Sequence, residues 1–350
     1  MSCQASEIAS TVKQAYTTRT PLNITAAGTK SFLGQQSDSG KPLDMTGHCG
    51  IIEYDPAELV MVARAGTPLR DIERALAEHR QMLGFEPPFV DTGATLGGAV
   101  AAGLSGPRRA YAGAVRDFVL GASFVNGKGE TAVAGGKVMK NVAGFDLFRP
   151  MAGSMGTLGV ILKVALRLLP LPEVEKTLLH EETDELAALR KMNRWPLETQ
   201  AISATSWDGL HIRIRLSGSA SGIEHARSLI GGDYITATNY WRELNNFRLD
   251  FFQQTGRLWR ISLAPMSEPL GLDPRQLLDW GGAQRWLKSD EPAATIRERA
   301  SQLGGHAECY ERDSSVATFH PLEGNLLAVN QRLKAAFDPA GILNRGRLLI

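Results

Sequence analysis

The sequence predicts an α+β protein of two domains. Its 350 residues are enough to build two hydrophobic cores. The part before Pro170 alternates short strand patterns with glycine-rich turns, whereas the part after it combines amphipathic helices with alternating strands and holds all 6 tryptophans. The run Pro170-Leu171-Pro172 between them is typical of a boundary between domains.

The first part is predicted to be rich in short strands. A helix is expected to follow Thr67 as N-cap and Pro68 as first helical residue, and its apolar face is expected to hold Leu69, Ile72, Ala75 and Leu76. Asn126-Gly127-Lys128-Gly129 is expected to turn one strand into the next. The strand patterns cover residues 22–26, 50–54, 59–65, 118–125 and 160–168.

The second part is predicted to contain an antiparallel sheet with helices. His211, Arg213 and Arg215 alternate with apolar residues, which indicates a strand with one solvated or cleft-facing side. For Arg213 and Arg215, a solvated face of the sheet is the preferred interpretation, and binding of an anion by both side chains is the alternative. Core or interface packing is expected for the tryptophans. Helices are predicted over residues 184–193, 221–230, 292–303 and 322–337.

Composition excludes several classes of protein. The net charge of +1 gives no reason to expect nucleic acid as a partner, and no apolar run approaches the roughly 18 residues of a membrane span. The start lacks the pattern of a signal peptide. Cys3, Cys49 and Cys309 form no CxxC, so neither a metal nor an iron–sulfur cluster is expected, and Cys49 beside His48 is expected to pack. A cytoplasmic enzyme or enzyme subunit fits best.

Three glycine-rich turns are the strongest functional signal. The first loop is Ala26-Ala27-Gly28-Thr29-Lys30-Ser31, the second loop is Gly93-Ala94-Thr95-Leu96-Gly97-Gly98, and the third loop runs from Gly153 to Gly159. Such runs expose backbone N–H groups and allow close approach of a ligand. They predict a site for a large planar cofactor, although ordinary turns remain the simpler alternative.

Common nucleotide motifs do not account for these turns. Gly153, Gly156 and Gly159 are spaced G-x-x-G-x-x-G and precede a strand, unlike the dinucleotide fingerprint, which precedes a helix. Gly28-Thr29-Lys30-Ser31 lacks the leading glycine and the spacing of a phosphate-binding P-loop.

The ordered set of motifs resembles the FAD-linked oxidase family of vanillyl-alcohol oxidase and D-lactate dehydrogenase type. The first loop resembles its pyrophosphate loop, and the second and third loops resemble its flavin loops. The matching segments are 26–31, 93–98, Tyr111-Ala112-Gly113-Ala114-Val115-Arg116-Asp117, Lys140–Asp146 with 153–159, and Phe337-Asp338-Pro339-Ala340-Gly341-Ile342-Leu343-Asn344. Within that family, the short second domain, residues 281–286 and the ending resemble FAD-binding subunits of bacterial glycolate oxidase (glycolate dehydrogenase).

The resemblance implies a two-lobed FAD-binding domain and a smaller α+β domain with an antiparallel sheet. It implies domains at 1–172 (FAD binding), 173–335 (substrate, cap or partner interface) and 336–350 (return to the FAD domain). Arg116 and Asp117 are expected to pair and fix their loop. The residues expected to bind FAD are Ala26, Ala27, Gly28, Thr29, Lys30, Ser31, Gly93, Ala94, Thr95, Gly97, Gly98, Gly103, Gly113, Val115, Gly159, Val160 and Ile161.

The sequence departs from the family at three points. The first loop has no histidine and the second no cysteine for covalent attachment, so dissociable FAD is expected. The family's H-x-G-D-G-N segment is missing; His320-Pro321-Leu322-Glu323-Gly324-Asn325 is a faint echo, and His320 is expected to be a capping or loop residue. Arg345 stands where the C-terminal motif usually has proline.

Two functions remain open from the sequence. The first is the FAD-binding subunit of a complex that oxidises glycolate, with D-lactate as a second candidate, and passes electrons from flavin to an iron–sulfur subunit. The partners implied are a larger FAD subunit and that iron–sulfur subunit, with the complex peripheral at the inner face of the cell membrane. The second is an electron-relay or assembly subunit that binds FAD and oxidises nothing itself. A free-standing aldonolactone or sugar oxidase is a weaker third. Catalytic residues are not identified.

Overall fold

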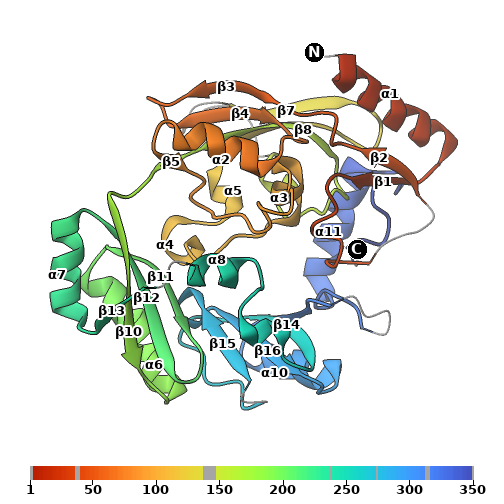
Figure 1. Ribbon diagram of the computed structural model, residues 1–350. Helices are drawn as coiled ribbons and strands as arrows, with labels where there is room; N and C mark the ends of the chain where they lie inside the picture. The colour runs from red at the N-terminus through yellow and green to blue at the C-terminus, as the bar shows by residue number, and fades with distance from the viewer. Residues whose placement is uncertain are drawn as a thin grey trace. The chain divides into compact units, whose positions relative to one another are not determined.

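The chain forms two compact units, coloured along the sequence in Figure 1. The computed structural model describes residues 3–35, 40–136, 147–236, 239–272, 275–311 and 316–348. The first unit comprises Met1–Ser105, Gly113–Pro170 and Pro321–Ile350, and the second comprises Gly106–Ala112 and Leu171–His320. The functional division at residues 172 and 335 stays a prediction; by compactness, the helix at Gly324–Phe337 groups with the first unit.

The first unit is built on a five-stranded sheet of order β3-β4-β8-β6-β7, in which each pair is antiparallel. Two small sheets accompany it: parallel β1-β2 and antiparallel β5-β9. The elements of this unit are α1 (Cys3–Thr18), β1 (Leu22–Thr25), β2 (Lys41–Asp44), β3 (Ile51–Asp55), β4 (Val60–Arg64), α2 (Leu69–Ala77), β5 (Gln81–Met82), α3 (Leu96–Ala102), α5 (Val115–Phe118), β6 (Val119–Val125), β7 (Thr131–Gly135), the 3-10 turn Arg149–Met151, β8 (Val160–Arg167), β9 (Leu169–Pro170) and α11 (Gly324–Phe337).

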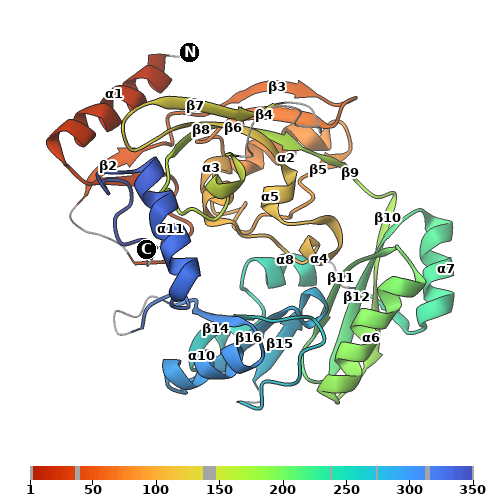
Figure 2. The same cartoon turned by 180° about the vertical axis from the view of Figure 1, so that it is seen from behind.

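Helices α2, α3 and α5 lie on one side of the five-stranded sheet (Figures 1 and 2). Helix α1 contributes Ala5, Ile8, Val12 and Ala15, spaced at helical intervals, to a core with strands β1, β2, β6 and β8. Buried Ile342 and Leu343 of the C-terminal segment, residues 338–348, complete that core. The chain end is therefore part of the first unit's packing.

The second unit is built on an eight-stranded antiparallel sheet of order β13-β10-β12-β11-β15-β16-β14-β17. Its elements are α4 (Arg109–Ala112), β10 (Val174–Glu181), α6 (Glu185–Glu198), β11 (Ile202–Trp207), β12 (His211–Gly218), α7 (Ala220–Ile230), β13 (Asp233–Ile235), α8 (Tyr240–Asn245), α9 (Asp250–Gln253), β14 (Arg257–Ser262), β15 (Gln276–Asp279), the 3-10 turn Trp280–Gly282, β16 (Gln284–Ser289), α10 (Ala293–Gln302) and β17 (His306–Cys309).

Helices α6 and α7 bury one end of this sheet. They form a core with Ile212, Ile214 and Leu216 of β12, while α10 packs through Ile296 and Ala300 on the other end. All six tryptophans are buried, which confirms the packing prediction and leaves no exposed tryptophan surface. The α+β class and the antiparallel sheet are likewise as predicted.

Two local expectations need correction. Helix α2 begins at Leu69 with Pro68 as its N-cap, and Thr67 does not cap it. The Thr67 hydroxyl instead accepts from the Gly50 amide at 2.9 Å and contacts the Arg64 carbonyl at 2.7 Å, so it joins two strand ends. Cys49 is exposed and does not pack.

In the parts of the chain described, none of the helices has both the length and the apolar character that crossing a lipid bilayer requires.

Candidate functional site

The first unit contains a cavity of about 300 Å³, within the range of small-molecule sites. The first loop, helix α3, the third loop and the C-terminal segment form its walls. Its lining residues are Asn23, Ile24, Thr25, Ala26, Ala27, Gly28, Thr29, Lys30, Ser31, Gln35, Met45, Ala65, Thr95, Gly97, Gly98, Ala101, Ala102, Met155, Gly156, Gly159, Ile161, Asn344, Arg345 and Arg347.

The charges around the cavity are of one sign. Lys30, Arg345 and Arg347 are in its lining, and the described residues of that lining include no aspartate or glutamate. Lys30 is only 8% exposed. Its Nζ lies 3.3 Å from the Thr29 hydroxyl and 5.4 Å from the centre of the Phe89 ring. Burial lowers the pKa of Lys30 to about 8. A buried ammonium that pairs with no carboxylate of the described residues favours an anionic ligand.

The first loop presents backbone donors to the same cavity. The Ser31 amide donates to the Gly28 carbonyl at 3.0 Å and so closes the turn. The N–H groups of residues 27–30 have no acceptor among the described residues. Gly28 has φ +69°, a left-handed conformation that favours glycine. Consecutive free N–H groups in such a turn form an anion-binding concavity.

Small and apolar residues form the rest of the wall. Gly97 of α3 lies against the end of strand β4, where an added Cβ would come within 2.6 Å of the Ala65 Cβ. Ala101, Met45 and Ile161 continue this apolar side. The lining thus combines cationic side chains and backbone amides with small and apolar residues, which suits a ligand with an anionic part and a flat ring.

Hydrogen bonds join the third loop to helix α3. The Gly153 amide donates to the Val100 carbonyl at 3.0 Å, and the Met155 amide donates to the Ala101 carbonyl at 2.8 Å. Gly103, at the end of α3, approaches the same loop so closely that an added Cβ would lie 2.9 Å from the Gly153 Cα. Backbone packing between two loops therefore accounts for Gly103.

The structure brings together most of the residues predicted to bind a cofactor. Those in the lining are residues 26–31, Thr95, Gly97, Gly98, Gly159 and Ile161, and those outside it are Gly93, Ala94, Gly103, Gly113, Val115 and Val160. Ala94, Val115 and Val160 are buried in the core. Whether each residue binds FAD stays a prediction.

Sequence reasoning expected the C-terminal segment to return to the FAD domain but named none of its residues at the site, and it also missed Asn23, Gln35 and Met45. The motif ending at Asn344 was the available signal, but it gave no partner for that residue. The Lys140–Asp146 motif lies outside the described residues. Arg116 and Asp117 form no ion pair in the described structure; Asp117 instead fixes its loop by accepting from the Ala114 amide at 2.8 Å.

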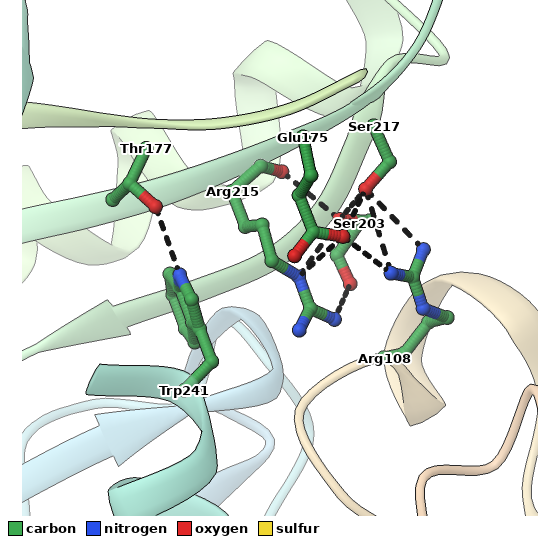
Figure 3. A network of polar contacts seen from close by, with 7 residues as sticks. All are labelled: Arg108, Glu175, Thr177, Ser203, Arg215, Ser217 and Trp241. Atoms are coloured by element: carbon green, nitrogen blue, oxygen red, sulfur yellow. Dashed lines mark hydrogen bonds and ion pairs between the residues drawn. The ribbon is translucent and has the colours of Figure 1, made fainter. Parts of the chain in front are cut away.

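The predicted solvated face of the β12 strand is covered. Figure 3 shows Arg215 between Ser203 and the ring of Trp241, with Glu175 and Ser217 alongside. Arg215 Nε lies 3.0 Å from the Ser203 hydroxyl and 3.7 Å from Glu175, which also pairs with Arg108 at 2.8 Å. These groups form a polar network within the second unit, in which Arg108, Ser203 and Arg215 are buried and Glu175 is exposed.

Arg213 and His320 have structural partners as well. Arg213 pairs with Asp208 at 2.5 Å and lies over the Tyr240 ring at 4.6 Å. His320 Nδ1 accepts from the Ala307 amide at 3.3 Å, which agrees with the expected capping role. Among the described residues, no group of three His, Cys, Asp or Glu side chains could hold a metal ion.

Comparison with known proteins identifies the family. Residues 4–135 match the model of an FAD binding domain. The chain is 43% identical over 337 residues to glycolate oxidase subunit GlcE of Escherichia coli strain K12, covering 96% of this chain and 95% of that one. The chain belongs to the FAD-binding oxidoreductase family of glycolate oxidase subunit GlcE.

More distant relatives also match this chain. Glycolate oxidase subunit GlcD of Bacillus subtilis strain 168 is 32% identical over 172 residues, 48% of this chain and 36% of that one. An alkyldihydroxyacetonephosphate synthase structure superposes with a TM-score of 0.67 at 14% identity, covering 98% of this chain and 75% of that one. At that identity the likeness concerns the fold alone.

The chemistry of the cavity lining suits the family's cofactor, FAD, which carries a diphosphate and a flat isoalloxazine ring. The free N–H groups of the first loop and the Lys30 ammonium suit the diphosphate. The small and apolar residues Gly97 and Ile161 suit the ring. The residues present therefore fit an FAD molecule.

Proposed function

We propose that this chain is the FAD-binding subunit of a multi-subunit glycolate oxidase. The observation that carries the proposal is a cationic cavity with free backbone amides and no carboxylate in its described lining, in a chain 43% identical to GlcE over nearly its whole length. D-Lactate is a second candidate substrate.

The residues of the cavity would bind and orient the cofactor. Lys30 and the amides of residues 27–30 would neutralise the diphosphate, and Gly97 would allow the ring to lie against α3. When bound, FAD would supply the acceptor for a hydride from the 2-hydroxy acid. The protein's share is binding, orientation and electrostatic tuning.

The cofactor is proposed to be dissociable. The first loop contains no histidine and the second loop no cysteine, so neither offers a side chain for the attachments seen in parts of the family. Lys30, a residue of the cavity lining, serves better as a charged partner because its ammonium is protonated at neutral pH.

The proposed partners are a second FAD subunit and an iron–sulfur subunit at the inner face of the cell membrane. The name of the GlcE relative describes a subunit of glycolate oxidase, and GlcD, which carries the name of another glycolate oxidase subunit, matches 48% of this chain. This chain has only 3 cysteines, well separated, so an electron-accepting cluster would have to be supplied by another chain.

The alternative is a relay or assembly subunit that oxidises no substrate. It is favoured by the second unit, where the candidate anion ligands Arg213 and Arg215 already contact carboxylates and His320 caps a strand. In this reading the partner subunit provides the residues that hold the substrate carboxylate.

Anaerobic reduction separates these readings. The purified chain, loaded with FAD, is mixed with glycolate without oxygen, and the visible spectrum is followed. Bleaching supports substrate oxidation by this chain, and an unbleached flavin supports the relay role. Failure to bind FAD after reconstitution contradicts both. Acid release of the flavin into the supernatant checks that attachment is not covalent.

A further inference from the structure

The C-terminal segment reaches the cavity through one asparagine, Asn344. The Asn344 Oδ1 accepts from the Ile24 amide, at the entry to the first loop, at 2.6 Å. The Asn344 Nδ2 donates to the Met155 carbonyl in the third loop at 2.7 Å. One side-chain amide therefore joins two cavity walls that lie more than a hundred residues apart in the sequence.

The same link continues to the third wall. The Met155 amide donates to the Ala101 carbonyl at the end of α3, so the first loop, the third loop and α3 are connected in series. Gly156 leaves room for this joint, since an added Cβ would lie 2.7 Å from Asn344 Nδ2. The geometry is thus specific to an asparagine opposite a glycine.

The backbone of Asn344 is held in a costly conformation. Its φ is +41°, in the left-handed region that residues other than glycine seldom adopt. Its amide donates to the Leu22 carbonyl at 3.0 Å, and its carbonyl accepts from the Arg347 amide at 3.1 Å. Asparagine tolerates this region better than most residues, but glycine would suit it without strain. Asparagine at this position therefore provides the two side-chain hydrogen bonds that glycine would lack.

Buried charges fix the segment that carries Asn344. Asp338 is 2% exposed and accepts from the amides of Ile342 and Leu343 at 3.1 and 2.8 Å. Lys334 Nζ bonds Asp338 at 2.6 Å and also donates to the Thr157 carbonyl of the third loop at 2.7 Å. Asn344 is therefore presented from a rigid support.

We propose that Asn344 is a positioning residue that holds the first and third loops at the spacing the cofactor needs. Without its amide the loops sample other separations, and FAD binds only the fraction with the right one. This rests on the proposed function only in naming FAD as the ligand.

The test compares Asn344→Gly with Asn330→Ala. The first removes the side chain while suiting the positive φ, and the second removes an amide that donates only within α11, to Leu326 at 2.8 Å. We expect Asn344→Gly to raise the Kd for FAD about tenfold, the factor worth one hydrogen bond, and to alter the visible circular dichroism of the bound flavin. Asn330→Ala leaves both unchanged.

Hydrogen exchange of the FAD-free proteins provides a readout independent of the cofactor. Amides in residues 22–31 and 153–159 should exchange faster in Asn344→Gly than in the wild type. Gly156→Ala, which pushes against Asn344 from the other side, should do the same. Unchanged exchange in both variants overturns the inference whether or not FAD binds. If the wild-type chain binds no FAD but both variants still exchange faster than the wild type, the proposed function is overturned and the positioning role of Asn344 stands.

Discussion

Lys30 is a buried cation in the lining of the cavity. Its ammonium is enclosed without a carboxylate partner among the described residues, and burial lowers its pKa to about 8. A buried cation of this kind costs stability in the free protein. The cost is offset when an anion binds, so the residue favours the loaded state.

Replacing Lys30 should therefore weaken FAD binding selectively. We expect Lys30→Met to raise the Kd for FAD by about ten- to a hundredfold, the range for a hydrogen bond to a charged group. The measurement is quenching of flavin fluorescence on titration. Lys128→Met is the control, because Lys128 is an exposed residue of the β6–β7 turn outside the cavity lining. Equal losses in the two variants would contradict a specific role for Lys30.

The pH dependence of binding should have the same origin. A bound diphosphate favours the protonated form of Lys30, and in the free protein that form is lost above about pH 8. Above about pH 8, Lys30 must therefore take up a proton from solution when FAD binds. The affinity for FAD is highest below pH 8 and falls by up to about tenfold per pH unit above it. Titrations from pH 6 to 10 should show this rise of Kd in the wild type. A curve of the same shape in Lys30→Met would assign it to another group.

At the scale of elements, helix α3 lies in tight contact with the end of β4. A methyl group on Gly97 would lie 2.6 Å from the Ala65 Cβ and 3.0 Å from its carbonyl oxygen. Gly97→Ala should displace the helix at a cost of about 1–3 kcal/mol, which lowers the Tm by several degrees. Gly98→Ala is a control on the same helix, since its Cβ would meet only the Thr95 hydroxyl at 3.1 Å. Thermal unfolding of both apoproteins by circular dichroism measures the difference, and equal Tm values would contradict the tight packing.

Most strands of the first unit were predictable because they are apolar or alternating runs that a glycine or proline follows within three residues, as in β1, β4 and β8. Helix α1 was missed, since three of its apolar residues, Ala5, Ala9 and Ala15, are small and give a weak pattern. The face of β12 was misread for a different reason. Its arginines read as solvated until α8, distant in sequence, supplies the Tyr240 and Trp241 rings that cover them.

The cavity was predictable where glycine marks it and not elsewhere. The first loop and Gly97 are in the lining, as expected from backbone that must approach a ligand. Gly103 and Gly113 lie outside the lining, and their tight contacts and positive φ account for them. In the sequence, a glycine required for these reasons cannot be distinguished from one that a ligand approaches. Asn344 depends on a contact between the two ends of the chain, which no local pattern encodes.

At the scale of the whole molecule, the chain passes between the two units more than once. Segment 106–112 belongs to the second unit although the residues on both sides belong to the first. Arg108 holds it through Glu175 at 2.8 Å, Tyr111 through Thr205 at 2.9 Å, and the Gly106 carbonyl accepts from Trp280 Nε1 at 3.0 Å. The described residues that line the cavity all belong to the first unit.

Stability and cofactor binding should therefore respond separately to a change at Arg108. Arg108→Met removes a largely buried guanidinium and leaves Glu175 with one cation fewer, so we expect about 1–3 kcal/mol of destabilisation and a Tm lower by a few degrees. The Kd for FAD, measured below the temperature of thermal unfolding, should stay within about twofold of the wild-type value. No hydrogen bond in the cavity changes, and the loss of even one would change the Kd by more than this factor. Arg190→Met, at an exposed position of α6, removes the same charge and should change neither value. A rise of Kd in Arg108→Met alone would mean that the second unit helps to set the geometry of the cavity, and that the cofactor site cannot be assigned to the first unit by itself.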